Sequence, residues 1–288
     1  MSPHQCVLLR VDGYEGTQST STLEDTLLHA LGFSGGPWEW DLVKRTARTM
    51  LVKNVVHCLN RPFARPTSTT YPLNEYDWYV WMEELAWTVS EEMKGEMSVV
   101  CSGYAPLPVW MLLGHVLTKQ GRRISVLNFH KTEPPALIDI SAAAQHGARD
   151  THHLGTPRGD PTGAEAGRGR AAALFVTQFA GTALSPSSET SLVEMVPQYQ
   201  LHIWQARPPL STLTVDKTNF SEIKSELRNW VKKIISTEPQ VLLLATSMVD
   251  GVALYLGGLI TLNDFRRVVF CEFFQYRYFK AFDLPTNP

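Results

Sequence analysis

The chain has 288 residues, of which 44% are hydrophobic and 19% charged, and its formal net charge is -2. This length and composition fit an ordinary globular protein with one large or two small domains. The lack of basic excess argues against a general duplex-DNA binder, which normally carries a basic stripe. A nucleic-acid ligand would have to be small and held locally.

The N-terminal segment has no basic stretch followed by a long apolar one, and no apolar run approaches the roughly 20 residues that span a bilayer. We therefore expect a cytoplasmic protein without a membrane partner. The cysteines Cys6, Cys58, Cys101 and Cys271 show no CxxC spacing, and three lie in apolar segments. This pattern favours buried, reduced thiols over metal ligands or disulfides.

The first half of the chain predicts an alternation of strands and helices. The segment EYDWYVWMEELAWTVSEEMKG places Trp78, Trp81, Leu85 and Val89 at helical spacing, with Gly95 at a C-cap position. The other expected elements are a strand at 6–16, a strand at 97–103, a turn at 104–108, a helix at 109–121 and a strand at 122–129. The second helix contains a Leu-Gly step, and an Arg-Arg pair precedes the last strand.

The second half repeats this order. A helix at 218–235 carries Ile223, Leu227 and Trp230 on one face, and Asn219 with Glu222 resembles a capping box. The other expected elements are a strand at 173–183, a strand at 240–247, a turn at 248–251, a helix at 252–262 and a strand at 266–274. The Leu-Gly step and the Arg-Arg pair recur at the matching places, which indicates an internal duplication.

The alternating elements predict the fold class. Strands that alternate with helices form mainly parallel sheets with helices on both faces. We therefore expect an α/β protein with two Rossmann-like lobes related by pseudo-twofold symmetry, at 1–140 and 171–288. The intervening segment 141–170 is rich in Gly, Arg and His and poor in large apolar residues, which is typical of a solvated linker.

The fold class predicts where a ligand binds. In open parallel sheets, ligands occupy the crevice beyond the carboxyl ends of the strands, where a turn leads into a helix whose N-terminal amides favour anions. We expect Ser102, Gly103 and Tyr104 at one lip of this crevice and Thr246, Ser247 and Met248 at the other, and matching lips from two lobes would suit an anionic, pseudo-symmetric ligand. The expected ligand-binding residues are Gly13, Tyr14, Ser102, Gly103, Tyr104, His130, Lys131, Phe179, Thr246, Ser247, Met248 and Phe274.

Two of these residues have a specific expected role. Lys131 follows the closing strand of the first lobe and would meet a phosphate, while Phe274 would stack on a base or serve in the core. The pairs Arg122–Arg123 and Arg266–Arg267 precede their strands, at the end opposite the expected site. For these arginines we expect surface or subunit-contact roles, not phosphate binding.

The segment VVCSGYAPLPVWMLLGHVLTKQGRRISVLNF, with its counterpart VLLLATSMVDGVALYLGGLITLNDFRRVVFCEFF and the following QYRYFKAF, resembles the SAVED domain, which is similar to two fused CARF subunits. The resemblance implies a sensor of cyclic oligoadenylates or cyclic trinucleotides in bacterial antiphage defence, as in CBASS and type III CRISPR systems. It implies no cofactor. SAVED proteins commonly carry an effector on the same chain, so the effector here is expected in trans, or the subunits relay the signal by head-to-tail self-association.

Enzymatic alternatives have weaker patterns. Asp216, Glu222 and Lys224 spell a D…ExK nuclease pattern, but the last two are expected on the polar face of a helix and not on a strand that holds a metal. Cys101 and Ser102 are expected at a strand-to-helix turn, without the flanking G-x-S-x-G of α/β hydrolases. No GxxxxGK[ST] or GxGxxG motif occurs. A ring nuclease, a hydrolase-like enzyme and a structural module with a vestigial pocket remain alternatives to the sensor, with no catalytic or metal-binding residue assigned.

Overall fold

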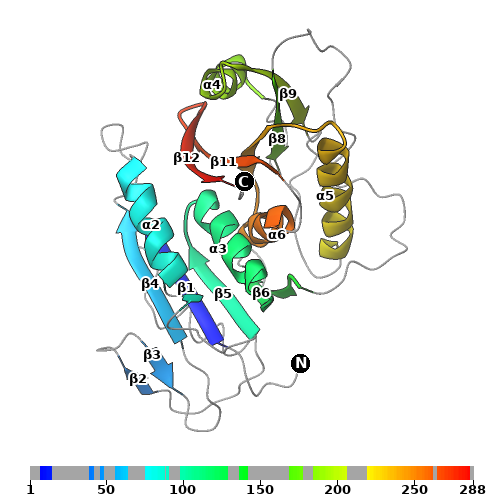
Figure 1. Ribbon diagram of the computed structural model, residues 1–288. Coiled ribbons are helices and arrows are strands. Elements are labelled where there is room, and N and C mark those ends of the chain that lie inside the picture. Colours follow the sequence, from blue (N-terminus) through cyan, green and yellow to red (C-terminus); the bar gives the residue numbers. More distant parts are fainter. Residues whose placement is uncertain are drawn as a thin grey trace.

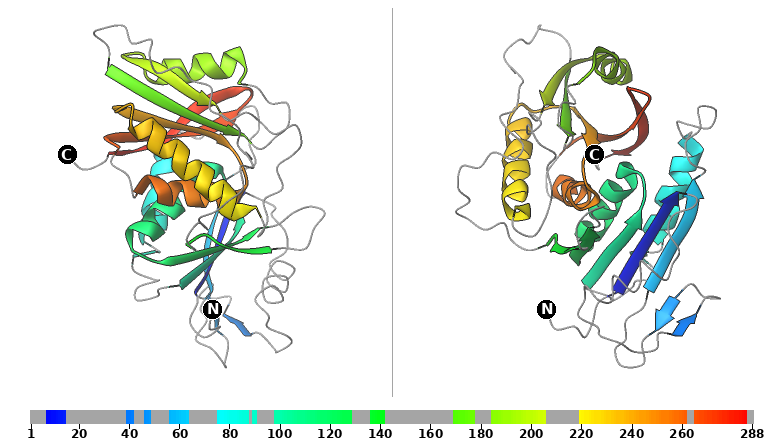
Figure 2. Two further views of the ribbon diagram at one scale, coloured as in Figure 1. Left: turned by 90° about the vertical axis from the view of Figure 1, so that its right-hand side faces the viewer. Right: turned by 180° about the vertical axis from the view of Figure 1, so that it is seen from behind.

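The computed structural model describes residues 7–14, 39–41, 46–48, 56–63, 75–87, 89–90, 98–128, 136–141, 169–177, 184–205, 219–261 and 265–285. Each half of the chain builds one five-stranded sheet, and helices from both halves meet between the two sheets (Figure 1). The other views show the same layering (Figure 2).

The first sheet has the strand order β4-β1-β5-β6-β7 and is parallel except for β7. Its strands are β1 (Val7–Tyr14), β4 (Val56–Phe63), β5 (Ser98–Tyr104), β6 (Arg123–Asn128) and β7 (Ala136–Asp139). Two described helices belong to this half, α2 (Glu75–Trp87) and α3 (Leu107–Lys119). A separate small hairpin pairs β2 (Glu39–Asp41) with β3 (Thr46–Arg48).

The second sheet has the strand order β12-β11-β10-β8-β9 and is parallel except for β12. Its strands are β8 (Gly169–Thr177), β9 (Tyr199–Gln205), β10 (Val241–Ser247), β11 (Arg267–Phe274) and β12 (Arg277–Pro285). The helices of this half are α4 (Pro186–Met195), α5 (Phe220–Ile235) and α6 (Asp250–Thr261).

The two sheets have the same topology. Read from the opposite edge, the second order is β9-β8-β10-β11-β12, so β8 stands for β1, β10 for β5 and β11 for β6. Each lobe closes with one antiparallel strand. This repetition confirms the predicted α/β fold with two Rossmann-like lobes.

Burial explains why the central strands read as continuous apolar runs. All side chains of 171–176 in β8 and of 241–246 in β10 are buried, because helices or the other lobe cover both faces of the sheet. Successive side chains of these strands point to opposite faces of the sheet, and they belong alternately to two hydrophobic clusters. One large cluster contains side chains of both lobes, and a smaller one lies between the second sheet and α4.

The Leu-Gly step of each half forms the crossing of α3 and α6. A Cβ atom on Gly114 would lie 1.9 Å from the carbonyl oxygen of Leu254, and one on Gly257 would lie 1.8 Å from the carbonyl oxygen of Met111. The two helix backbones therefore touch, which only glycine permits. The contacts are reciprocal, since each helix places a glycine against the residue three positions before the glycine of the other. Reciprocal contacts of this kind are expected from a twofold axis, which explains the repeated Leu-Gly sequence.

The outer helices repeat the reciprocity with different chemistry. Helix α2 reaches the closing strand of the second lobe, where Trp78 contacts Phe282 with ring centroids 6.0 Å apart. Helix α5 reaches the closing strand of the first lobe, where Lys224 Nζ lies 3.4 Å from the carbonyl oxygen of Asp139 and 3.5 Å from that of Ile140. The two lobes thus contact each other through aromatic rings at α2 and through a buried ammonium group at α5.

Several local expectations differ from the structure. Strand β8 begins at Gly169, before the expected start of the strand, because its first residues pair with Tyr199 and Gln200 of β9. Asn219 has helical dihedral angles and makes no capping hydrogen bond through its side chain, so the capping box does not form. The elements without a counterpart among the predicted ones are the strands β2, β3, β4, β7, β9 and β12 and the helix α4. Most of the predicted linker, 142–168, lies outside the described residues, so the domain boundaries remain predictions.

Candidate ligand site at the strand ends

The first predicted lip forms where β1 and β5 end side by side. Gly13 and Tyr14 end β1, and the parallel pairing of Val11 with Gly103 and of Asp12 with Tyr104 brings the two strand ends together. Gly103 has φ of +119°, and a Cβ atom on it would lie 2.1 Å from the Val11 carbonyl oxygen. Only glycine fits this position, where the chain leaves the sheet toward α3.

The second lip forms in the same way where β10 and β8 end. Thr246 and Ser247 pair with Val176 and Thr177 of β8. Met248 follows and is buried, and α6 begins at Asp250. The members of each predicted lip are therefore neighbours within their own sheet, and the two lips are connected through the crossing of the helices that follow them.

Thr246 is an unusual member of the second lip. Its side chain is only 2% exposed, and its Oγ1 has no hydrogen-bond partner among the residues that the structure describes. A buried hydroxyl without a partner costs about 1–3 kcal/mol relative to a satisfied one. A ligand that accepts or donates a hydrogen bond there would recover part of this cost. Ser102, in the first lip, is equally buried.

The first turn of α6 lies against the opposite lobe. A Cβ atom on Gly251 would lie 2.9 Å from Val126 Cγ1 of β6, and α3 makes the corresponding contact with β11. Asp250 lies in the same turn, half-buried, and burial raises the pKa of its carboxyl to about 7. Near neutral pH this carboxyl is therefore partly protonated, which weakens its repulsion of an anionic ligand. The sequence pattern had not singled out Asp250.

Phe274 ends β11 beside the hairpin turn into β12 and is half-buried. It lies one strand outward from the second lip, because β11 pairs with β10. His130, Lys131 and Phe179 lie outside the described residues, and so does Asp216. Their proposed roles remain predictions.

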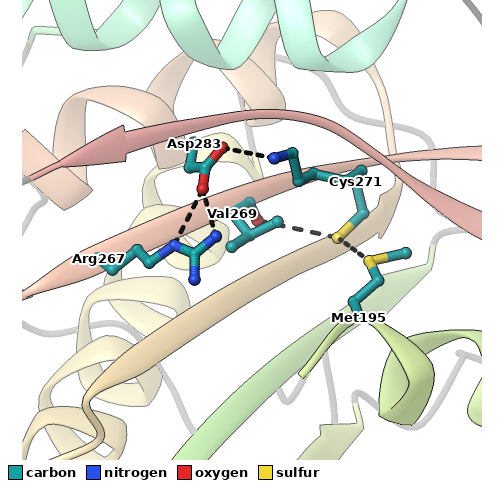
Figure 3. Close-up of polar contacts among 6 residues, drawn as sticks. Met195, Arg267, Val269, Cys271 and Asp283 are labelled. Atoms are coloured by element: carbon teal, nitrogen blue, oxygen red, sulfur yellow. Dashed lines mark hydrogen bonds and ion pairs between the residues drawn. The ribbon is translucent and has the colours of Figure 1, made fainter. Parts of the chain in front are cut away.

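One arginine of each pair has a structural partner, while Arg123 and Arg266 are exposed, as expected. Arg122 is buried and donates from Nη2 to the Val89 carbonyl oxygen at 2.9 Å, which ties the start of β6 to the segment after α2. This burial differs from the expected surface role. Arg267 donates from Nε to Asp283 Oδ2 at 2.9 Å across the β11–β12 hairpin (Figure 3). Lys280 Nζ lies 3.1 Å from Asp283 Oδ1.

Three residues considered for catalysis are buried. Cys101 and Ser102 lie inside β5, before the turn, and burial raises the pKa of the Cys101 thiol, which disfavours the nucleophilic thiolate. Lys224 was expected on the polar face of a helix but is 2% exposed between the lobes. The expectation was wrong because Lys224 Nζ lies over the rings of Phe220 and Tyr255, at 5.3 and 5.9 Å from their centroids. These contacts and the carbonyl oxygens stabilise a charge inside the protein.

Neither a metal site nor a membrane span is found in the described part of the chain. No group of three or more His, Cys, Asp or Glu side chains in these residues is arranged to hold a metal ion. None of the described helices has the length and hydropathy needed to cross a membrane.

No family model matches the sequence, and no curated protein matches it. Several solved structures match the fold of this chain. The SAVED/CARF-domain containing receptor Cap4 of Acinetobacter baumannii, with the cyclic trinucleotide 3'3'3'-cAAA, superposes with a TM-score of 0.55 at 11% identity, over 78% of this chain and 49% of the receptor. The fold is that of SAVED/CARF receptors. The same receptor with 2'3'3'-cAAA gives 0.54 at 12% identity, over 78% and 48% of the two chains.

A receptor from a second organism has the same SAVED/CARF fold. Cap4 of Moraxella osloensis superposes with a TM-score of 0.52 at 11% identity, over 77% of this chain and 47% of the receptor. The present chain thus spans about half the length of these receptors. At this identity the likeness concerns the SAVED/CARF fold alone.

Proposed function

We propose that this protein is a sensor that binds a cyclic oligonucleotide second messenger between its two lobes, in the bacterial cytoplasm. On this proposal the lobes are residues 1–140 and 171–288, joined by the linker 141–170. Occupancy is relayed in antiphage defence, through self-association of the sensor or through a separate effector.

The observation that carries this proposal is the reciprocal crossing of α3 and α6. Gly114 and Gly257 hold two equivalent helices in contact, and each helix starts directly after one predicted lip. A ligand that contacts both lips meets two similar sets of backbone amides. A ring of repeated nucleotides presents similar phosphates at regular intervals, so each lip can meet a phosphate of the same kind. The Acinetobacter receptor with the same fold was solved with cyclic trinucleotides.

A relay follows from a site shared by two lobes. A ligand shifts the relative orientation of the lobes only by its differential affinity for the two arrangements. The two lobe contacts described above, aromatic at Trp78–Phe282 and polar at Lys224, are the places where such a shift would be accommodated.

The test is a binding titration of the purified chain with cyclic triadenylates and larger cyclic oligoadenylates, followed by chromatography of the nucleotide. We expect saturable binding and recovery of the intact ring. Thr246→Val removes the buried hydroxyl at nearly constant volume and should weaken binding by about 2- to 10-fold. Val193→Ser, an exposed substitution on α4, is the matched control. Linear products would identify a ring nuclease instead, and absence of binding to the whole panel would refute the proposal.

A further inference from the structure

The first turns of α3 and α6 occupy equivalent places in the two lobes but carry different side chains. Counted back from the glycines of the crossing, Gly114 and Gly257, the first residues of the two helices match, and they are Leu107 in α3 and Asp250 in α6. The first turn of α3 contains no acidic residue, whereas α6 opens with a carboxyl group. The two lips therefore lead into similar backbone amides but into different side-chain chemistry.

The Asp250 carboxyl has no partner that explains its place in the fold. It makes no hydrogen bond or ion pair with another residue that the structure describes, and α6 contains no lysine or arginine. The residue is half-buried, so an incoming molecule can still reach it. Burial raises the pKa of this carboxyl to about 7, and its charged form therefore costs stability above that pH. Titratable groups that burden the fold in this way are typical of functional sites.

Thr246 supplies a second polar group near this carboxyl. Its Oγ1 is buried and has no hydrogen-bond partner in the described part of the chain. Thr246 is on the same sheet face as Leu242 and Leu244, which pack in one cluster with Val252 of α6. The hydroxyl thus lies on the side of the sheet where α6 begins. Because buried polar groups are nearly always hydrogen-bonded, this one indicates a polar partner that binds there.

The backbone at the start of α6 adds two donors. The first helical hydrogen bonds are donated by the Val252 and Ala253 amides to the Val249 carbonyl oxygen, at 3.0 and 3.1 Å. The amides of Asp250 and Gly251 precede them and, like the leading amides of any helix, have no acceptor within the helix. A carboxyl, a hydroxyl and two amides therefore follow one another closely at the end of the second lip.

A sugar hydroxyl beside a phosphate matches this set of groups. A hydroxyl donates and accepts hydrogen bonds, so it can donate to a carboxylate, whereas a phosphodiester oxygen only accepts and is repelled by one. In a ring of 3'-linked ribonucleotides, the free 2'-hydroxyl stands on the carbon next to the one that bears the phosphate. The helix amides can therefore bind the phosphate while Asp250 binds the neighbouring hydroxyl.

We propose that Asp250 accepts a hydrogen bond from a ribose 2'-hydroxyl of the cyclic nucleotide, so that the second lip distinguishes ribonucleotide rings from deoxyribonucleotide rings. This inference rests on the proposed function and assigns one group of the ligand to one residue of its site. The 2'-hydroxyl is the group by which a protein tells the two kinds of sugar apart. Leu107, at the matching place, offers no acceptor in its side chain, so the first lip binds the phosphate without reading the sugar.

The experiment is calorimetric titration of the full chain with 3'3'3'-cyclic triadenylate and with the same ring built from 2'-deoxyadenosine. The parent should bind the ribose ring at least about tenfold more tightly, because the deoxy ring cannot make a hydrogen bond to a charged group. In Asp250→Ala the two affinities should lie within about twofold of each other, mainly through a loss for the ribose ring. Asp250→Asn retains an oxygen acceptor and should keep part of the preference.

Leu107→Ala is the matched control, since it alters the same helix position in the other lobe. It should change the affinities for both rings by the same factor and leave their ratio as in the parent. A parent that binds both rings equally, or an Asp250→Ala variant that keeps the full preference, overturns the inference while the sensor stands. A parent that binds neither ring refutes the sensor and this inference with it. Circular dichroism checks that each variant is folded.

Discussion

The contact of α3 with α6 makes a prediction about Gly114 and Gly257 that can be tested by stability alone. Replacing either glycine by alanine places a methyl group 1.9 or 1.8 Å from a carbonyl oxygen of the other helix. A contact of this kind needs at least about 3 Å, so the helices would have to separate by about 1 Å or more at the crossing. Because the atoms met are backbone atoms, no side-chain rotation relieves the clash.

Two effects oppose each other in these variants, and their sizes decide the outcome. Alanine stabilises a helix by about 0.8–1.0 kcal/mol relative to glycine. Overpacking a well-packed core costs about 1–3 kcal/mol and occasionally more. The clash at Gly114 is with backbone, which places it at the upper end of that range. We therefore expect Gly114→Ala and Gly257→Ala each to lower the free energy of unfolding by about 1–2 kcal/mol.

The assay is urea denaturation followed by circular dichroism, with the unfolding free energy taken from midpoint and slope. Gly258→Ala is the matched control in the same helix, because its Cβ would meet the Thr118 hydroxyl at 2.4 Å, and that side chain can rotate away. The control should be neutral or slightly more stable. If Gly114→Ala is also more stable than the parent, helix propensity outweighs the contact, and the reciprocal crossing is not as close as described.

Two further predictions concern buried charges. Burial raises the pKa of Asp250 to about 7, so the folded protein binds this proton more tightly than the unfolded chain, and its contribution to stability is present below pH 4 and is lost as the pH rises through 7. Asp250→Asn should accordingly gain unfolding free energy over the parent at pH 8, with a gap that shrinks toward pH 5 in urea titrations; a constant gap contradicts the assignment. Lys224→Met keeps the aliphatic stem and removes a desolvated charge, so it should change stability by less than about 1 kcal/mol, whereas Lys224→Ala should cost about 2 kcal/mol or more. Equal losses in both variants, by the same titration, would mean that the bonds to Asp139 and Ile140 carry the stabilisation.

The sequence by itself determined the order and type of most elements and the duplication. Residues 241–245 are apolar because a central parallel strand is buried on both faces, and the helix at 220–235 shows its buried face as a period in the sequence. These signals are local. The strand ends that form the two lips could be predicted from them, since the topology of a parallel sheet fixes where its turns lie.

Tertiary structure decided what the local pattern left open. Lys224 looks like a surface residue by its charge alone, although its spacing from Leu227 and Val231 places it at the edge of the buried face, and the rings of Phe220 and Tyr255 together with β7 of the other lobe enclose it. Arg122 likewise follows a glycine at a helix end, but Val89, distant in sequence, provides the carbonyl that accepts its hydrogen bond. The missing side-chain cap at Asn219 has no local sign either. Burial and hydrogen bonding of polar groups depend on which segments meet in space. The short-range pattern of the sequence does not indicate contacts between residues that are tens of positions apart.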